Sequence, residues 1–324
     1  MDSSNQNILG LRSSRLNGLV TRESYWIEIQ KQLRLLEPIT QICEKSQISL
    51  IFREGKIIVQ ISLLEMMNIE MYLDVEDIRS VPFSVIADGK YEPLLSDLIL
   101  GLAAQSKYFL DIGANVGYYS ISAAKINSQL KIKSFEPNPM IVEKFKRNID
   151  LNQLSSQIEI FECGLGSENS DLTQMFIPQF TGSGGGSLKN LHPEEGKPDT
   201  LSIKVRILDE LLNMDSATVD LMKIDVEGFE KYVLEGGMGT IRNYLPTIVI
   251  ELLRKWMLPF NTSPQDVLQS LKLFGYRCYA IQKLKLLEID EIDDMTEATN
   301  FIFVHPLREI HSEWLLGKAE SSAK

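Results

Sequence analysis

From Tyr91 onward, short apolar segments alternate with longer segments of helical periodicity. This rhythm predicts parallel strands joined by helical crossovers, because parallel neighbours cannot be joined by a tight turn. In NPMIVEKFKRNIDL, for example, Ile141, Val142 and Phe145 share one face and charged residues take the other, as on a helix that covers a sheet. We expect strands near 108–112, 131–136, 158–163, 219–224 and 247–251.

Two later apolar segments, 277–281 and 300–304, have no long helical pattern between them. They are therefore predicted to pair as antiparallel strands at one edge of the sheet, which makes the sheet mixed. The acidic segment between them, EIDEIDDMTEA, lacks the glycine turn and the regular ligand spacing of a calcium loop. We interpret it as a solvated loop.

The amino-terminal part has a different pattern. Residues 1–20 show no sustained period and are expected to be loose, whereas Glu23 to about Lys45 reads as one amphipathic helix. Residues 49–82 hold short β-rich runs divided by a turn at Glu54 and Gly55. The predicted organisation is an α+β extension at 1–83, a main α/β domain at 84–308 and a carboxy-terminal tail at 309–324.

Composition excludes some classes of function. A net charge of -11 argues against a nucleic-acid partner, because binding to phosphates needs clustered Lys and Arg. Cys43, Cys163 and Cys278 are widely spaced and form no CxxC pair, so neither a disulfide framework nor a zinc site is expected. The start lacks a signal-like pattern and no apolar stretch is long enough to span a bilayer, so a cytoplasmic protein without a transmembrane segment is expected. A homodimer is compatible with this interpretation.

The segment FLDIGANVGYYS runs from an apolar strand through a glycine turn into a helical pattern. Aligned on Gly113 with the dinucleotide fingerprint GxGxxG, it has Asn115 and Tyr118 in place of the second and third glycines. Asp111 would also place negative charge beside a pyrophosphate. The turn is therefore a poor match for a nicotinamide dinucleotide.

S-adenosylmethionine makes the opposite demand, since it has no phosphate and carries an ammonium and a sulfonium against one carboxylate. Asp111 then becomes favourable as part of an acidic rim. Gly113 and Gly117 allow close backbone approach, and amides at the helix start can receive the cofactor's carboxylate. Asp111, Gly113, Asn115 and Gly117 are therefore predicted to bind the cofactor.

The ends of the second and third strands complete the predicted nucleoside site. Glu136 can accept two hydrogen bonds from a ribose diol, a group that NAD and S-adenosylmethionine share; otherwise it is an ordinary exposed glutamate. Cys163, Gly164 and Leu165 would reach the adenine, and small residues there leave room for a flat ring. The alternative is that Gly164 only forms a turn.

The segment DLMKIDVEGFE places Asp225 across the crevice from the glycine turn, where ligands bind in open α/β sheets. Asp225 is the first candidate for a general base, Glu227 the second and Glu251 the third. Glu227 and Glu230 can instead serve only the following helix N-terminus. Lys223, on the same strand face, would weaken Asp225 as a base unless it points away or binds an anionic group. Magnesium held by the three base candidates is an alternative that the spacing does not require, so no metal is predicted.

Three other features are ambiguous. His192 could be a base or an ordinary surface histidine. The run from Gly182 to Gly186 could form a lid or a linker. Trp256 and Phe260 could stack on a sugar or simply pack in the protein.

The motifs DIGANVGYYS, FEPNP, CGLG, KIDVEGFE with LEGG, and PTIVIELL occur in this order over roughly residues 91–305, where the YEPLL stretch also fits. Together they resemble the FkbM family of S-adenosylmethionine-dependent methyltransferases. The resemblance implies a class I, Rossmann-like mixed sheet of order 3-2-1-4-5-7-6 and methylation of a hydroxyl, often on a sugar, glycolipid or natural product. The first 80 residues have no assigned counterpart, and the resemblance does not identify the small-molecule or glycan acceptor.

Two other functions compete with methyl transfer. The first is a non-catalytic module that binds S-adenosylmethionine and presents its amino-terminal helix to a partner. The second is a nicotinamide oxidoreductase, which Asp111, Asn115 and Tyr118 disfavour.

Overall fold

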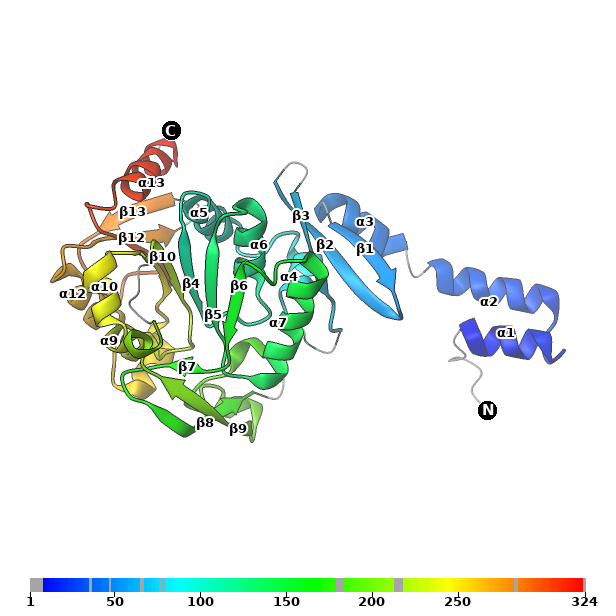
Figure 1. Cartoon of the computed structure of the whole chain (residues 1–324). Helices are drawn as coiled ribbons and strands as arrows, with labels where there is room; N and C mark the ends of the chain where they lie inside the picture. The colour runs from blue at the N-terminus through cyan, green and yellow to red at the C-terminus, as the bar shows by residue number, and fades with distance from the viewer. Residues whose placement is uncertain are drawn as a thin grey trace.

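The computed structural model describes residues 8–34, 37–46, 48–64, 67–75, 77, 80–178, 183–212, 218–282 and 285–322. An eight-stranded mixed sheet lies between two layers of helices (Figure 1). The strand order is β13-β12-β14-β11-β10-β4-β5-β6. The strands are β4 (Tyr108–Ile112), β5 (Lys131–Phe135), β6 (Ile158–Phe161), β10 (Leu221–Ile224), β11 (Thr247–Glu251), β12 (Arg277–Gln282), β13 (Lys285–Ile289) and β14 (Asn300–Val304).

The predicted α/β class is confirmed, and so are its two kinds of strand pairing. Strands β6, β5, β4, β10 and β11 are parallel neighbours. Strands β12 and β14 pair antiparallel, as the lack of a long helical pattern between them predicts. Numbered along the chain without β13, the strands lie in the order 3-2-1-4-5-7-6; β13 adds an edge strand that was not expected.

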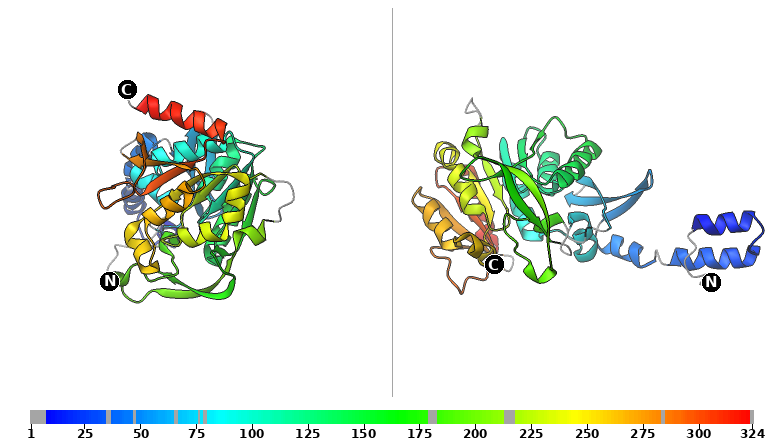
Figure 2. Two further views of the ribbon diagram at one scale, coloured as in Figure 1. Left: turned by 90° about the vertical axis from the view of Figure 1, so that its left-hand side faces the viewer. Right: turned by 90° about the horizontal axis from the view of Figure 1, so that it is seen from below.

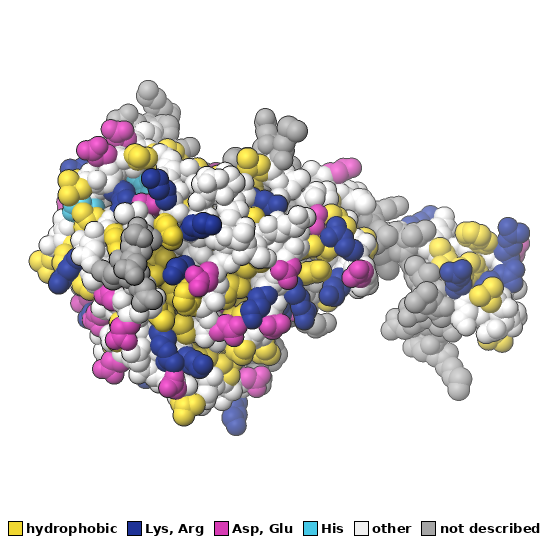
Figure 3. All heavy atoms as spheres, in the orientation of Figure 1, with side chains coloured by type: hydrophobic (Ala, Val, Ile, Leu, Met, Phe, Trp, Pro, Cys, Tyr) yellow, Lys and Arg dark blue, Asp and Glu magenta, His cyan; other side chains and the backbone are white. Residues whose placement is uncertain are grey.

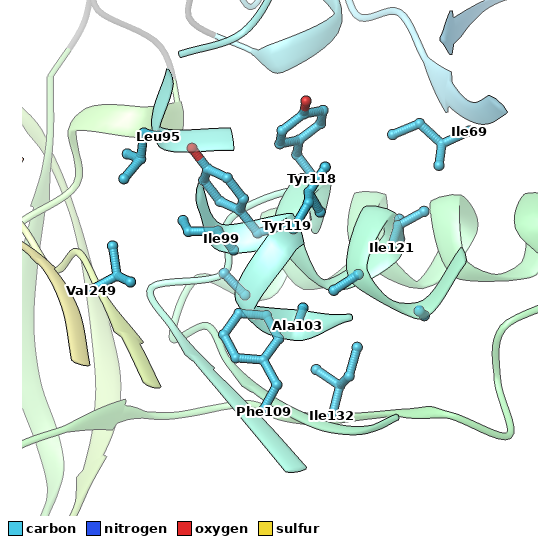
Figure 4. Packing of buried hydrophobic residues seen from close by; sticks show 14 of the residues in the cluster. Ile69, Leu95, Ile99, Ala103, Phe109, Tyr118, Tyr119, Ile121, Ile132 and Val249 are labelled. Atoms are coloured by element: carbon cyan, nitrogen blue, oxygen red, sulfur yellow. The ribbon is translucent and has the colours of Figure 1, made fainter. Parts of the chain in front are cut away.

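Successive residues of a strand point alternately into two separate hydrophobic cores. In β4, Phe109 belongs to one hydrophobic cluster, whereas Leu110 and Ile112 belong to the other. Figure 4 shows Phe109 and Ile132, from neighbouring strands, pointing toward the helix that carries Ile121. Helices α5 (Pro93–Ala103), α6 (Tyr118–Ile126), α7 (Pro139–Asn152) and α13 (Glu309–Ser322) share the first cluster; α8 (Leu208–Leu211), α9 (Glu230–Gly236), α10 (Met238–Tyr244) and α12 (Pro264–Lys272) share the second (Figures 1 and 2).

A small second sheet, not predicted from the sequence, lies at the lower end of the parallel strands in Figure 1. Its order is β7-β9-β8, with β7 and β9 parallel and β8 antiparallel to β9. Its strands are β7 (Gly164–Leu165), β8 (Ser170–Ile177) and β9 (Asp199–Arg206), and the nearby short elements are η1 (Ser183–Gly185), η2 (Pro193–Glu195), α11 (Arg254–Met257) and η3 (Leu258–Phe260).

The amino-terminal part corrects two predictions. Residues expected to be loose contain a helix, α1, although residues 1–7 lie outside the described part. The single expected helix is two helices, α2 and α3, on either side of residues 35–36, which are not described. The predicted strands and their turn at Glu54 and Gly55, both with positive φ, are confirmed. The elements are α1 (Ile8–Leu16), α2 (Arg22–Arg34), α3 (Glu37–Ser46), β1 (Ile48–Arg53), β2 (Lys56–Leu64), β3 (Met67–Tyr72) and α4 (Val81–Asp88).

Two asparagines of α7 attach the amino-terminal sheet to the main sheet's helices. The side-chain amide of Asn152 accepts from the N–H of Glu70 at 3.0 Å and donates to the carbonyl of the same residue at 2.6 Å. One turn earlier, Asn148 accepts from the N–H of Tyr72. These side chains pair with the free edge of β3 as a neighbouring strand would, so its backbone groups are satisfied.

The boundary proposed for the extension falls within a helix, and the proposed tail is itself helical. Residues 83 and 84 both lie inside α4, so this boundary stays a prediction. The expected tail is helix α13, whose buried His311 contacts Thr247 Oγ1 at 2.8 Å and Ser106 Oγ at 3.2 Å. In the described part of the chain, no helix combines the length and the apolar character that crossing a bilayer demands.

Replacing Asn152 by Ala should lower the free energy of unfolding by about 1 to 3 kcal/mol, because both backbone groups of the half-buried Glu70 lose the partner that the buried Asn152 provides. Urea denaturation followed by circular dichroism would measure this. Glu143→Ala, on the exposed face of the same helix, is the control, since it loses only a surface ion pair with Lys146. Equal stability of the two variants would contradict the role given to Asn152.

Candidate active site

A cavity of about 350 Å³ lies at the carboxyl ends of the parallel strands. Residues from β4, β5, β10 and β11 form one side, and residues of the small sheet β7-β9-β8 form the other. This volume suits a small-molecule site, and the position is the one at which open α/β sheets bind ligands. The predicted residues Gly113, Asn115, Glu136, Gly164, Asp225 and Glu227 all line it.

The glycine turn depends on two positions without a side chain. Gly113 has φ 76°, and a Cβ there would lie 1.8 Å from the carbonyl oxygen of Asp225. Gly117 has φ 88°, and a Cβ there would lie 1.9 Å from the ring of Phe145. Gly113 therefore lets the ends of β4 and β10 meet, while Gly117 seats α6 against α7. Only Gly113 lines the cavity, so direct binding of a cofactor by Gly117 is not supported.

Glu136 lies at the end of β5 with its carboxylate held in place. Its two oxygens accept backbone N–H groups of Asn115 at 3.0 Å and Asn138 at 2.9 Å. Burial raises the pKa of Glu136 to about 7, although both hydrogen bonds oppose the shift. Each carboxylate oxygen can accept a second bond, so Glu136 can still receive hydroxyl groups of a ligand.

The prediction that Asp111 forms an acidic rim is wrong. Asp111 is fully buried and does not line the cavity. Its Oδ2 accepts the hydroxyl of Ser120 at 2.5 Å, and burial raises its pKa although the charge of Lys223 opposes the shift. The strand alternation that turns Ile112 to one face turns Asp111 to the other, beneath α6. Asp111 therefore acts on the site only through its neighbours.

The end of the third strand contributes fewer residues to the cavity wall than expected, and the small sheet contributes more. Gly164 and Leu165 line the cavity, but Cys163 does not; its thiol is buried, which raises its pKa to about 11. The small sheet adds apolar side chains that cover this end of the cavity. They are Met175, Ile203 and Val205.

Lys223 is the buried cation of the site. Its ammonium lies 3.0 Å from Asp225 Oδ2 and 3.2 Å from the carbonyl oxygen of Gly113. Burial alone would lower the pKa of Lys223, but the charges of Asp225 and Asp111 raise it. Lys223 therefore stays charged and points into the site, which excludes the alternative in which it points away.

Four carboxyl groups converge around the end of β10: Asp225, Glu227, Glu251 and Glu92. Burial and the charges of Asp225 and Glu227 raise the pKa of Glu251, which is also hydrogen-bonded to Asp225. Burial likewise raises the pKa of Glu92, although a 2.6 Å hydrogen bond from the hydroxyl of Tyr119 opposes the shift. The raised pKa of Glu251 favours its protonated form, so this cluster can offer a hydrogen-bond donor as well as acceptors.

Sequence reasoning missed Glu92 and Tyr91 as site residues, although both line the cavity. Glu92 has φ 39° and precedes α5, which begins at Pro93. A non-glycine residue in this left-handed conformation carries strain that the surroundings must offset. The YEPLL segment was the available signal, but nothing in its composition linked it to the strands that follow.

In the turn after β10, two acidic residues that the sequence did not distinguish have different roles. Glu230 is buried, and its Oε1 accepts the backbone N–H groups of Val226 and Gly228, so it supports the turn as one alternative expected. Glu227 lines the cavity instead, with φ 54°. Glu227 therefore borders the space that a ligand would occupy, whereas Glu230 is structural.

The ambiguous features are also resolved in part. Trp256 lines the cavity, whereas Phe260 packs against Phe229. Gly184 and Gly186 line it too, although Gly182 lies outside the described residues. His192 does not line the cavity; it is largely buried and lies edge-to-face with Trp256, so it is not ordinary surface, and its position does not support a role as base.

A metal at the carboxylates is not supported. Among the described residues, one group of His, Cys, Asp and Glu is close enough to share an ion: His192, Glu194 and Glu195. Asp225, Glu227 and Glu251 do not form such a group.

The cavity as a whole suits S-adenosylmethionine. Glu136 stands at one end beside Gly164 and apolar side chains, which fits a ribose next to a flat ring. The carboxyl groups around Asp225 stand at the other end, which fits a positively charged group. A phosphate-bearing dinucleotide would meet these carboxylates with like charge.

Comparison with known proteins agrees with this chemistry. The Methyltransferase FkbM domain family matches residues 111–278. Methyltransferase 1 of Beauveria bassiana (strain ARSEF 2860) is 29% identical over 45% of this chain and 64% of its own length. Methyltransferase sdnD of Sordaria araneosa is 26% identical over 45% of this chain and 67% of its own length. The crystal structure of Methyltransferase FkbM from Methylobacillus flagellatus KT has a TM-score of 0.39 at 14% identity, covering 72% of this chain and 56% of that chain.

The fold and the site define a class I α/β methyltransferase. The chain belongs to the FkbM family, whose cofactor is S-adenosylmethionine, since the family match covers about half of the chain. The matched segment runs from Asp111 to Cys278, so it includes the glycine turn, Glu136 and the carboxylates after β10. The amino-terminal extension lies outside it.

Replacing Glu136 by Gln should weaken binding of S-adenosylhomocysteine roughly 10- to 100-fold, the value of a hydrogen bond to a charged group. In the unmodified protein, affinity should also fall as the pH drops through about 7, because protonation of Glu136 removes acceptor positions. Isothermal titration calorimetry across this range would show a break that the variant lacks. Glu159→Gln, an exposed position on β6, is the control. An identical pH profile in all three proteins would exclude Glu136 from the site.

Proposed function

We propose that this protein transfers a methyl group from S-adenosylmethionine to a hydroxyl oxygen, with a sugar or a related polyol as acceptor. The observation that carries the proposal is the cluster of Asp225, Glu227, Glu251 and Glu92 around one end of the cavity. Carboxyl groups in ionised and protonated forms can accept from and donate to the hydroxyl groups of a polyol. The family membership and the matched methyltransferases support the reaction class.

The cofactor would lie between Glu136 and the carboxylate cluster, and it supplies the electrophilic methyl group. Glu136 would hold the ribose, and the backbone at Gly113 and Asn115 would border the rest of the cofactor. Gly164 and Leu165, under the apolar cover of the small sheet, would hold the adenine and exclude water from it. Positioning of this kind can contribute as much as about 7 to 11 kcal/mol to lowering a barrier.

Asp225 and Lys223 would set the electrostatics of the reacting end. Lys223 holds Asp225 by a 3.0 Å ion pair, so the carboxylate is fixed in place beside the glycine turn. In our proposal Asp225 therefore faces the positive charge of the cofactor and orients the acceptor. Pairing with a cation makes a carboxylate a weaker base, so Asp225 is disfavoured as the proton acceptor.

We assign the role of proton acceptor to Glu227. Glu227 lines the cavity in a turn that Glu230 and Ser187 hold: Glu230 accepts the N–H of Gly228, and the hydroxyl of Ser187 donates to the carbonyl of Glu227 at 2.8 Å. These contacts fix the backbone of the turn that places Glu227 on the cavity wall. Glu251, with its raised pKa, would act as a hydrogen-bond donor to the acceptor or to Asp225.

Trp256 supports a carbohydrate as the acceptor. Trp256 lines the same cavity as the carboxylate cluster, and its ring lies edge-to-face with that of His192 at a centroid distance of 6.0 Å. An aromatic face next to carboxylates suits a sugar ring, which has an apolar face and hydroxyl groups at its rim.

Glu227→Gln should lower kcat roughly 10²- to 10⁴-fold, the usual contribution of a positioned base, while affinity for S-adenosylhomocysteine stays within about threefold of the original. Asp225→Asn should weaken both kcat and cofactor affinity, because it removes the charge that faces the cofactor. Turnover would be measured with methyl-labelled cofactor and a panel of mono- and oligosaccharides. Calorimetry would give the cofactor affinity.

Glu235→Gln is the matched control, since Glu235 is an exposed carboxylate on α9 that does not line the cavity. Unchanged turnover in Glu227→Gln would remove Glu227 from the base role. Label that stays in the cofactor with every hydroxyl acceptor, and moves instead to amines or thiols, would contradict O-methylation.

A further inference from the structure

A second cavity, of about 370 Å³, lies where the amino-terminal sheet meets the methyltransferase domain. Its walls come from the turn between β1 and β2, the end of β3, the start of α4 and the outer face of α7. Val116, in the glycine turn, lines both this cavity and the first one. The second cavity is therefore separated from the candidate active site by one short piece of backbone.

The second cavity is cationic on a chain of net charge -11. Lys56, Lys144 and Arg147 line it, against one carboxylate, Asp74. Lys144 is paired with Asp74 at 2.7 Å and with Asp77 at 3.3 Å. Figure 3 shows Lys and Arg side chains, interspersed with acidic ones, over the region of α7 and the amino-terminal sheet.

The charges of Lys56 and Arg147, the other two cations of this cavity, are not offset by an ion pair among the described residues. Neither Lys56 nor Arg147 forms an ion pair with a residue in the described part of the chain. The ammonium of Lys56 lies 5.1 Å from the ring centroid of Tyr72, which positions it without neutralising it. A guanidinium and an ammonium on opposite walls of a cavity can together bind an anion.

The start of α4 faces the same cavity. Ser80 is its N-cap and lines the cavity, yet its side chain makes no capping hydrogen bond. Ser80 is 4% exposed, and its hydroxyl is buried without a hydrogen-bond partner. A buried hydroxyl without a protein partner is uncommon, and it leaves a donor that a bound group can use. In the first turn of α4, Pro82 has no N–H and the N–H of Ser80 is bonded to the carbonyl of Asp77, so the N–H groups of Val81 and Phe83 are the ones without an acceptor within the helix.

We propose that this second cavity binds a phosphate group. A phosphate offers oxygens enough to bridge Arg147, Lys56 and the start of α4, including the hydroxyl of Ser80. The proposal gives the amino-terminal extension a role, because Lys56 and Ser80 both precede the predicted domain boundary. It does not depend on methyl transfer, so it can fail or hold independently of the proposed function.

Isothermal titration calorimetry of the full chain with pyrophosphate and with inorganic phosphate tests the site directly. We expect saturable binding at millimolar concentration or below, weakening as ionic strength rises. Arg147→Gln and Lys56→Gln should each weaken pyrophosphate binding roughly 10-fold. Both side chains are exposed, so these variants should fold normally.

Lys146→Gln is the matched control. Lys146 adjoins Arg147 on α7, but it is paired with Glu162 and Glu143 and does not line the cavity. Its loss should leave pyrophosphate affinity unchanged. Absence of saturable binding, or an equal loss in Lys146→Gln and Arg147→Gln, would overturn the proposal.

Ser80→Ala separates binding from stability. Because the Ser80 hydroxyl has no partner, the free energy of unfolding without phosphate should not fall. Pyrophosphate affinity should nevertheless fall several-fold, since the hydroxyl would donate to the bound anion. Unchanged affinity would remove Ser80 and the start of α4 from the site.

The phosphate could belong to the methyl acceptor or to a separate ligand, and turnover distinguishes these sources. If the acceptor carries it, inorganic phosphate should compete with the acceptor and Arg147→Gln should raise KM only for phosphorylated acceptors. If a separate ligand carries it, phosphate should alter turnover without competing, and Arg147→Gln should abolish that response. Turnover that ignores phosphate at concentrations that saturate the calorimetric site would show that the site belongs to neither source.

Discussion

One buried ammonium organises the catalytic end of this fold. Lys223 joins the carbonyl of Gly113 at the end of β4 to the carboxylate of Asp225 at the end of β10, and its charge lies close to the buried Asp111. The two strand ends can approach closely because Gly113 has no side chain. A buried cation with nearby carboxylates is stable as a set, whereas any one member alone would be costly to bury. The positions of the cofactor turn and of the carboxylate cluster therefore depend on each other.

Features that follow from local patterns could be predicted from the sequence. The parallel strands, the covering face of α7 and the antiparallel pair β12 and β14 all show in hydrophobic periodicity and segment length. Gly113, Glu136 and Asp225 could be predicted as site residues because they follow apolar strands, and strand ends meet at one edge of a parallel sheet.

Features that depend on long-range packing could not be predicted. Asp111 and Ile112 are adjacent in sequence, but strand alternation buries one beneath α6 and turns the other toward the cavity. The small sheet β7-β9-β8 combines segments separated by a long connection, so its apolar residues had no visible link to the site. Glu92 takes its position from a strained backbone conformation and from Tyr119, neither of which composition reveals.

The amide contacts between α7 and β3 have a consequence for association between molecules. An unpaired strand edge can recruit a strand from another chain, and Asn148 and Asn152 occupy that edge with side chains instead of backbone. Among the described residues of the sheet β1-β2-β3, the outer side of β1 is the edge without such side-chain contacts. Growth of this sheet into an intermolecular one can therefore proceed in a single direction, away from the methyltransferase domain.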